Sequence, residues 1–342
     1  MTHHAAFYRG NHQFVVEPVA ERQPGPGEVA VDIAYVGICG TDMHVFHGNM
    51  DARVGLNRII GHETSGRVAA MGEGVEGLSV GDKVVVRPLH HCGDCPACRA
   101  GNSHICHNLK FLGLDTDGAM QSRWIVPAFT LHRLPPDMAL DVAAMVEPLA
   151  VAVHDVRRAR LARGETALVI GGGPIGMLIA MVAQAEGARV LLSEINESRM
   201  AMADALGFEG LNPRNLDVAQ AVLDRTGGAG ADVVFEVSGT QPGVDLMTDA
   251  AAARGRIVMV AIHAKKPQVD LFRFFWREIE MLGARVYEAQ DYDRAIAMIA
   301  EGLPVGRLIT DRHPLSGVQA AFDALNGNAT AMKSLIQIGD AA

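Results

Sequence analysis

The sequence has few cysteines, few aromatic residues and no cluster of basic residues. Aromatic residues make up 5% of its 342 positions, and the formal net charge at pH 7 is −9. An acidic chain without a basic patch lacks the electrostatic surface that binds nucleic acid. The N-terminal stretch MTHHAAFYRG has no apolar core and no small-residue cleavage site of the kind found in secretion signals. We therefore expect a cytoplasmic protein with no nucleic-acid or membrane partner.

One stretch is apolar enough to raise the question of a membrane span. Residues 166–185, TALVIGGGPIGMLIAMVAQA, contain no charged residue over twenty positions, which is the length that a bilayer-spanning helix needs. The Gly171-Gly172-Gly173-Pro174 sequence interrupts any continuous helix there. A buried strand, a tight turn and a buried helix explain the same residues, so we do not expect a membrane span.

Four of the five cysteines lie in one stretch, CGDCPACRAGNSHIC, at residues 92–106. In a cytoplasmic protein such close spacing is more often metal-binding than disulfide-forming. An iron–sulfur cluster commonly has three residues, not seven, before its last cysteine. Four thiolates that leave no open position are typical of structural zinc. We predict one structural zinc, with the neighbouring histidines as bystanders and four ligands: Cys92, Cys95, Cys98 and Cys106.

The remaining cysteine, Cys39, stands alone in YVGICGTDMH, and IIGHETSG with His62 and Glu63 follows about twenty residues later. Glu147 lies further on, in the otherwise apolar stretch MVEPLAVAVH. Taken singly, each residue has an ordinary structural explanation. Together they offer a thiolate, an imidazole and a carboxylate, and three such ligands leave a fourth position open, as in catalytic zinc sites. Thr41 and His44 are placed to carry a proton from that open position to solvent.

The glycine-rich stretch at residues 171–176 predicts a dinucleotide-binding loop. Gly171, Gly173 and Gly176 follow an apolar strand at 167–170 and open a helix near Pro174, which is the arrangement that receives a pyrophosphate. Glu194 ends the next strand, RVLLSEI, and an acid there binds the ribose 2′-hydroxyl and disfavours a 2′-phosphate. We therefore expect NAD, while Arg199 leaves room for NADP. The other residues assigned to this cofactor site are Ile175, Ser238 and Val260.

The length and pattern of elements indicate an α/β protein of two domains. The first 140 residues or so contain short strands and turns rich in Gly and Pro, such as QPGPGE and GEGVEG, which indicates a small β-barrel-like domain. Further strands are expected at 232–239, 255–262 and 280–286, separated by helical segments. Strands that alternate with helices predict a doubly wound parallel sheet of about six strands.

The sequence resembles the zinc-dependent medium-chain alcohol dehydrogenases over essentially its whole length. The shared segments are GICGTD, GHE, GDKV, the four-cysteine lobe, EPLA and GGGPIG, in that order. The GHE and EPLA glutamates make it similar to the polyol, butanediol and threonine dehydrogenase branch. The resemblance implies a GroES-like catalytic domain at 1–149 and 287–342, with a structural zinc lobe at about 88–110. It also implies a Rossmann NAD-binding domain at 150–286, and a tetramer or dimer.

The resemblance also assigns roles to the second group of residues. It implies that Cys39, His62 and Glu63 hold a catalytic zinc, and that Glu147 ligates it directly or holds its water. Asp42 orients His62 in this comparison, as metal-bound histidines usually require. By the same similarity, Thr41 and His44 form a proton relay.

The resemblance implies reversible oxidation of a secondary alcohol, such as a polyol, diol or sugar alcohol, to a ketone. It also implies two zinc ions per chain. The first alternative is a substrate that carries a carboxylate, such as threonine or a sugar acid. Such a substrate requires a cation, for which Arg123 or Arg285 is the candidate, and the stretch DGAMQSRWIVP departs from many relatives. The second alternative is a cofactor-binding protein without dehydrogenase activity, which the presence of all the zinc-ligand and relay residues disfavours.

Overall fold

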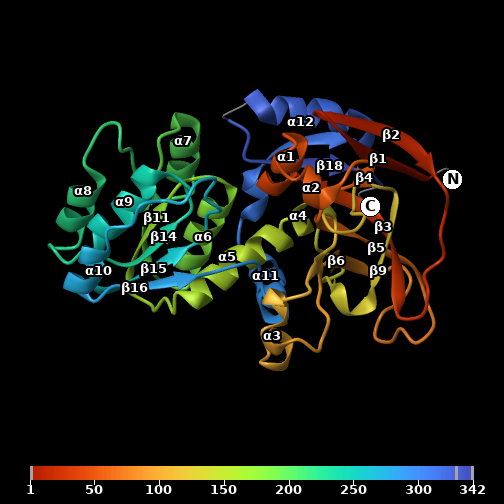
Figure 1. Ribbon diagram of the computed structural model, residues 1–342, viewed down its shortest axis with the longest axis horizontal. Helices are drawn as coiled ribbons and strands as arrows, with labels where there is room; N and C mark the ends of the chain where they lie inside the picture. The colour runs from red at the N-terminus through yellow and green to blue at the C-terminus, as the bar shows by residue number, and fades with distance from the viewer. Residues whose placement is uncertain (1–2, 328–329, 340–342) are drawn as a thin grey trace. The chain divides into compact units, whose positions relative to one another are not determined.

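The computed structural model describes residues 3–327 and 330–339, which form two compact units (Figure 1). Unit 1 comprises Met1–Glu147 and Glu288–Ala342, and unit 2 comprises Pro148–Tyr287. Helix α5 (Val146–Arg158) begins in unit 1 and continues into unit 2. Within the described residues, none of the helices combines the length and the apolar character needed to cross a bilayer.

Unit 1 is built on antiparallel strands that form two principal sheets. A seven-stranded sheet has the order β10-β6-β5-β3-β18-β17, with β9 also paired to β3, and a three-stranded sheet has the order β2-β1-β4. Strands β17 and β18 are a parallel pair that comes from the C-terminal part of the chain. The strands are β1 His3–Gly10, β2 Gln13–Val19, β3 Glu28–Gly37, β4 Arg58–Ile59, β5 Glu63–Met71, β6 Lys83–Val86, β7 Leu89–His90, β8 Lys110–Phe111, β9 Arg123–Pro127, β10 Leu131–Arg133, β17 Ile309–Pro314 and β18 Lys333–Gln337.

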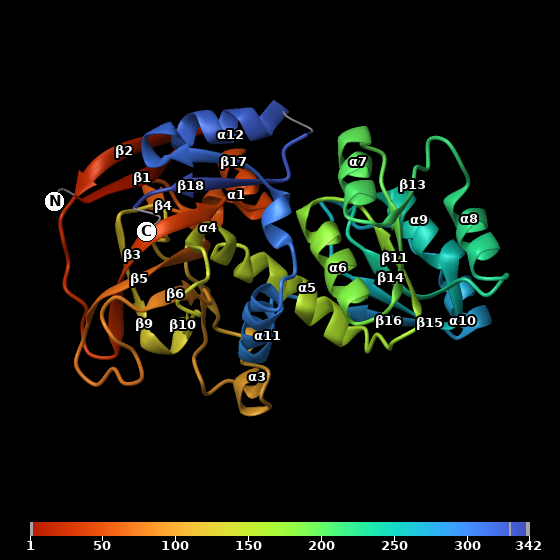
Figure 2. The ribbon, with the colours of Figure 1, turned by 180° about the vertical axis from the view of Figure 1, so that it is seen from behind.

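The longest strand of unit 1, β3, joins the N-terminal and C-terminal segments of this unit. β3 is apolar at most positions, and eight of its ten residues are buried; it pairs with β5, with β9 and with β18. The C-terminal strand β18 therefore lies beside the strand that leads directly to Cys39. Figure 2 shows helix α12 lying along the β17–β18 pair. The helices here are α1 Gly40–Phe46, α2 Asp51–Val54, α3 Pro96–Arg99, α4 Leu140–Ala143, α11 Ala289–Ala300 and α12 Val318–Gly327.

Unit 2 is a doubly wound parallel sheet with the strand order β13-β12-β11-β14-β15-β16. The order reverses between β11 and β14, and in such sheets a ligand binds at the carboxyl ends of the strands beside that reversal. Apolar side chains of the sheet pack against α8 and α9 in one continuous buried cluster. The elements are β11 Thr166–Ile170, α6 Pro174–Ala185, β12 Arg189–Ser193, α7 Glu197–Ala205, β13 Glu209–Leu211, α8 Val218–Arg225, β14 Ala231–Glu236, α9 Gln241–Ala250, β15 Ala251–Met259, α10 Leu271–Arg277 and β16 Glu280–Gly283.

The expected strands of unit 2 are present, with shifted ends. The strand expected at 255–262 spans Ala251–Met259 and follows directly on α9, because the small residues at 251–253 are already in the sheet. The strand expected at 280–286 ends at Gly283. Val286 has a φ of 49°, which is incompatible with strand conformation.

Candidate zinc and dinucleotide sites

Cys39 lies at the N-cap of helix α1, directly after strand β3. Its Sγ accepts a hydrogen bond from the Thr41 backbone N–H at 3.5 Å. Its own backbone N–H donates to Asp42 Oδ2 at 2.9 Å. This reciprocal capping box satisfies donors that a helix start otherwise leaves unpaired. The local sequence therefore fixes the thiol at the helix start and holds the Asp42 carboxylate beneath it.

The structure brings Cys39, His62 and Glu63 together. Their ligand atoms all lie within 4.8 Å of one another, and both His62 and Glu63 are buried. The pairing of β3 with β5 explains this proximity, because Gly37 and Glu63 are register partners. The nearby residue Gly61 has a φ of 97°, and a Cβ there would lie 2.8 Å from a Val36 methyl group, so the turn before His62 requires glycine.

His62 faces a buried carboxylate on its other side. Its Nδ1 lies 3.6 Å from Asp42 Oδ1, and neither atom has a hydrogen-bond partner. Burial lowers the pKa of His62, but the negative charges of Asp42, Cys39 and Glu147 outweigh this effect and raise it to about 10. These negative groups therefore stabilise a positive charge at the His62 ring. A thiolate, an imidazole and a carboxylate around such a point are a donor set that fits zinc.

The other residues expected at this site lie around it in different ways. Glu147 is buried in the first turn of α5, outside the close group of three donors, and its charge acts on His62. Thr41 is half-buried and His44 is exposed, and both are on helix α1. A helix places residues three apart on one face, so Thr41 and His44 lead from the buried end of α1 toward solvent.

The four clustered cysteines form a second group of donors. Their ligand atoms lie within 4.8 Å of one another, and all of them are free thiols. The backbone N–H groups of His107 and Asn108 donate to Cys95 Sγ and Cys106 Sγ at 3.4 and 3.3 Å. Backbone hydrogen bonds lower the pKa of Cys95 to about 6, so the structure favours a thiolate there. A closed set of four sulfur ligands fits a structural zinc ion.

The glycine loop of unit 2 has the shape that the sequence predicts. Gly171 has a φ of 107°, and a Cβ on Gly176 would lie 1.8 Å from the Gly171 carbonyl oxygen, so neither position tolerates a side chain. Gly173 is the N-cap of α6, and Pro174 is its first residue, followed by Ile175. Ser238 and Val260 follow the carboxyl ends of β14 and β15. These residues lie at the edge of the sheet that binds dinucleotides in doubly wound folds.

Glu194 lies immediately after β12 and faces this loop. Its Oε2 accepts from the Gly172 N–H at 2.8 Å, and its Oε1 accepts from the backbone N–H groups of Ile195 and Asn196. The Arg199 Nη1 lies 3.6 Å from Glu194 Oε2, and the buried Arg199 Nε has no hydrogen-bond partner. The site therefore presents an acid and a cation side by side where the adenosine ribose of a dinucleotide binds.

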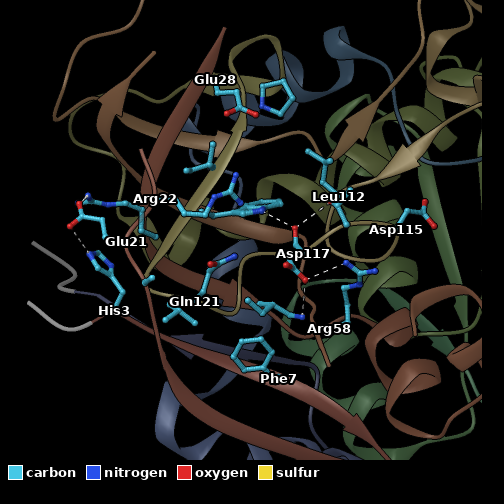
Figure 3. Close-up of a pocket in the computed structure, with 18 of the residues that line it drawn as sticks. His3, Phe7, Glu21, Arg22, Glu28, Arg58, Leu112, Asp115, Asp117 and Gln121 are labelled. Carbon is cyan, nitrogen blue, oxygen red and sulfur yellow. Dashed lines mark hydrogen bonds and ion pairs between the residues drawn. The ribbon is translucent and has the colours of Figure 1, made fainter. Parts of the chain in front are cut away.

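A separate pocket of about 560 Å³ lies in unit 1, between the loop at 20–28, β4, β9 and the segment at 112–117 (Figure 3). It contains neither zinc-ligand group. Arg58 and Asp117 form an ion pair on its wall, and its lining contains both acidic and basic side chains. Arg123 lines this pocket and pairs with Asp32 and Glu21 at 2.6 Å each. The positive charge of Arg123 is therefore already matched by two carboxylates, which argues against it as the cation for a substrate carboxylate.

Comparison with known proteins identifies both parts of the chain. Residues 25–136 match the model of the alcohol dehydrogenase GroES-like domain, and residues 174–301 match that of the zinc-binding dehydrogenases. The chain is 56% identical to a 2-dehydro-3-deoxy-L-galactonate 5-dehydrogenase of Pseudoalteromonas atlantica over 97% of its length and 98% of that protein. The chain belongs to the zinc-dependent medium-chain dehydrogenases. It is also 31% identical to an L-galactonate-5-dehydrogenase of Escherichia coli K12, with 88% of each chain covered.

Solved structures of this family share the whole fold. A zinc-binding dehydrogenase of Sinorhizobium meliloti 1021 bound to NADP superposes with a TM-score of 0.92 at 29% identity, covering 98% of this chain and 99% of that one. An alcohol dehydrogenase of Escherichia coli CFT073 complexed with NADH gives 0.90 at 25% identity, covering 98% and 100%. The chain is thus an oxidoreductase of the GroES-like and Rossmann fold that uses zinc and a nicotinamide cofactor.

The sequence did not single out two residues that shape the zinc-ligand group. Lys333, on β18, binds both oxygens of Glu63. Gly37 lies so close to Glu63 that a Cβ on it would be 2.2 Å from Oε2. A lysine at the start of the apolar strand KSLIQ was a usable signal, because a buried lysine requires an anionic partner.

Proposed function

We propose that the chain oxidises the C5 hydroxyl of a six-carbon sugar acid, 2-dehydro-3-deoxy-L-galactonate or a close analogue, with NAD as the hydride acceptor. The 56% identity over nearly the whole of both chains carries this proposal. The second sugar-acid relative also acts at C5. The expectation of a neutral polyol or diol is therefore replaced by its alternative, a substrate that carries a carboxylate.

We further propose that Cys39, His62 and Glu63 hold the catalytic zinc, with Glu147 close enough to ligate it or to bind its water. When bound, the metal supplies Lewis-acid polarisation of the substrate hydroxyl, and the nicotinamide takes the hydride. Asp42 holds the His62 ring by its Nδ1 face, which leaves Nε2 as the ligand atom. Thr41 takes the hydroxyl proton as it gives up its own, and the exposed His44 is the group at the outer end of this relay that exchanges a proton with solvent.

The four-cysteine lobe holds a second, structural zinc in this proposal. Its four sulfur atoms lie within 4.8 Å of one another and leave no position open for a substrate. The reduced state of all five cysteines suits a cytoplasmic location. Metal analysis of the purified chain tests the count: two zinc ions per chain are expected, and a single zinc would contradict one of the two assignments.

NAD is the proposed cofactor because Glu194 lies at the carboxyl end of β12, where an acid binds the ribose hydroxyls. Arg199 lies beside it and offsets part of its charge. The family includes both cofactors, as the NADP and NADH complexes of the two related structures show. Acceptance of NADP at lower efficiency is therefore part of the proposal.

A homo-oligomer, a dimer or a tetramer, is the proposed assembly. Four apolar side chains of the short helix α10 are between 64% and 76% exposed: Leu271, Phe272, Phe275 and Trp276. The adjacent strand β16 is an edge strand of the sheet of unit 2. Exposed apolar patches and open edges of this kind are usually covered by another chain.

The direct test of the proposed reaction is a substrate panel followed by NADH formation. We expect 2-dehydro-3-deoxy-L-galactonate to be oxidised with a kcat/KM at least a hundredfold above that for sorbitol, 2,3-butanediol and L-threonine. Equal or greater activity with a neutral diol would contradict the proposed substrate class. Arg285, which is exposed at the end of unit 2, remains the candidate for the substrate carboxylate, and Arg285→Met should raise the KM for the sugar acid without changing that for sorbitol.

A further inference from the structure

Lys333 is a buried cation in contact with one of the proposed zinc ligands. Its side chain is only 3% exposed. Its Nζ donates to Glu63 Oε1 at 2.8 Å, to Glu63 Oε2 at 2.6 Å and to the Ile38 carbonyl oxygen at 3.2 Å. An ammonium group has three donors, so all three have an acceptor. The Glu63 carboxylate is equally buried, at 1% exposure.

The backbone around Lys333 fixes this contact. Ser334, the next residue, accepts a hydrogen bond from the Ile38 N–H at 2.9 Å, and Ile38 directly precedes Cys39. Strand β18 thus binds the segment that carries Cys39 through its backbone, and it binds Glu63 through the lysine side chain. Strand β18 therefore adds to the pairing of β3 with β5, which places these two ligands side by side.

Gly37 closes the opposite side of the Glu63 carboxylate. A Cβ at that position would lie 2.2 Å from Oε2 and 3.1 Å from the Glu63 Cβ. The carboxylate is therefore confined between the backbone of β3 and the ammonium group of Lys333. Both partners thus restrict the position of this carboxylate in the structure.

The negative charge of a carboxylate bound in this way is partly neutralised by the cation. Each oxygen has two acceptor positions, and the lysine occupies one on each. One carboxylate oxygen also lies within 4.8 Å of a donor atom of Cys39 and of His62, so a metal held there would use a remaining position. An anionic ligand that is shared with an ammonium group donates less charge to a metal than an unshared one, so the metal stays a stronger Lewis acid.

We infer that Lys333 is a positioning residue that shares the Glu63 carboxylate with the catalytic zinc and so keeps this ligand weak. The inference rests on the proposed zinc site. A weak anionic ligand leaves the zinc electrophilic and exchangeable, whereas an unpaired, buried Glu63 binds it as a full anion. Loss of the lysine charge should therefore tighten zinc binding and slow turnover together.

The test is the release of zinc to a chromophoric chelator from wild type, Lys333→Met and Lys333→Gln. Of the kinetic phases of zinc release, the one that Cys39→Ser removes is assigned to the catalytic zinc. We expect release of that zinc to be at least tenfold slower in both variants, with a kcat at least tenfold lower and a shifted visible spectrum of the cobalt-substituted protein. Lys333→Arg, which keeps the charge, should stay within about threefold of wild type. Lys83→Met is the matched control, because Lys83 donates to the Met138 carbonyl oxygen away from the donor group.

A double variant shows whether the lysine acts through Glu63. In Glu63→Gln/Lys333→Met both charges are absent, so the slow release seen in the single variant should disappear. Slow release that persists in the double variant would overturn the inference, as would release from both single variants at or above the wild-type rate. If Lys333→Met does not fold, Lys333→Gln, which can still donate to Glu63, gives the same comparison. The substrate panel on wild type is independent of these results, so failure here leaves the proposed reaction intact.

Discussion

At the scale of single residues, the zinc-ligand group depends on side chains outside the three close donors. Asp42 is fully buried, lies outside that group and faces the Nδ1 of His62. A carboxylate behind a metal-bound histidine fixes the ring and raises its basicity. Sequence reasoning found this relation only through family resemblance, because residues 42 and 62 are joined in space by the pairing of β3 and β5.

Replacing Asp42 with Asn tests this role. An amide is uncharged and does not stabilise positive charge on the His62 ring as a carboxylate does. We therefore predict a 10- to 100-fold loss of zinc affinity or activity, as for other partners of metal-bound histidines. Circular dichroism should show an unchanged fold, and the zinc of the four-cysteine lobe should be retained. Wild-type zinc affinity in Asp42→Asn would contradict an orienting role.

Cofactor choice also depends on single residues. Glu194→Ala removes the acid beside the ribose and leaves Arg199 unopposed, so the ratio of NAD to NADP efficiency should fall by roughly tenfold or more. Arg199→Met should act in the opposite direction by weakening the binding of NADP. Titration with 2′,5′-ADP and ADP, followed by calorimetry, measures the same preference without turnover. An unchanged ratio in both variants would show that this pair does not contact the ribose.

At the scale of elements, short segments hold the four-cysteine lobe. Its elements are two two-residue strands, the four-residue helix α3 and a three-residue 3-10 helix, Ser103–Ile105. Segments this short cannot bury enough apolar surface to fold alone, and a metal ion is the usual substitute for a core. The cysteine spacing was enough to predict this cluster, because ligands within a short loop are close together in any fold.

The lobe should therefore lose stability when it loses a ligand. We predict that Cys95→Ser lowers the Tm by roughly 4 °C, which corresponds to about 3 kcal/mol for a chain of this size. Treatment of wild type with a chelator should give a similar shift. The activity of Cys95→Ser, measured well below its Tm, should persist, and lost activity of this variant at an unchanged Tm would assign the chemistry to this lobe instead.

At the scale of the whole molecule, the sequence predicted the fold class and the family but not the substrate. Periodicity and glycine spacing define the strand–turn–helix unit locally, so the loop at 171–176 could be found without a structure. Lys333 could not be linked to Glu63, because the two residues are 270 positions apart and meet only through strand pairing. The choice of a sugar acid over a polyol came from similarity to relatives, since substrate contacts follow no periodic pattern.

The oligomeric state is also a property of the whole molecule. If the exposed face of α10 is an interface, Trp276→Glu should place a charge within it and shift the protein to a smaller species. Light scattering after size-exclusion chromatography measures this change, and Lys265→Glu is a nearby exposed control. A monomeric wild type, or a variant of unchanged size, would contradict the proposed interface.

The proposed reaction is hydride transfer from C5 of a sugar acid to NAD. It can be tested with 2-dehydro-3-deoxy-L-galactonate that carries deuterium at C5, followed by mass spectrometry of both products. We expect one deuterium in the reduced cofactor and none at C5 of the oxidised acid, which becomes a ketone at that carbon. Deuterium retained in the acid while NADH forms would contradict it, because the hydride would then have come from another carbon.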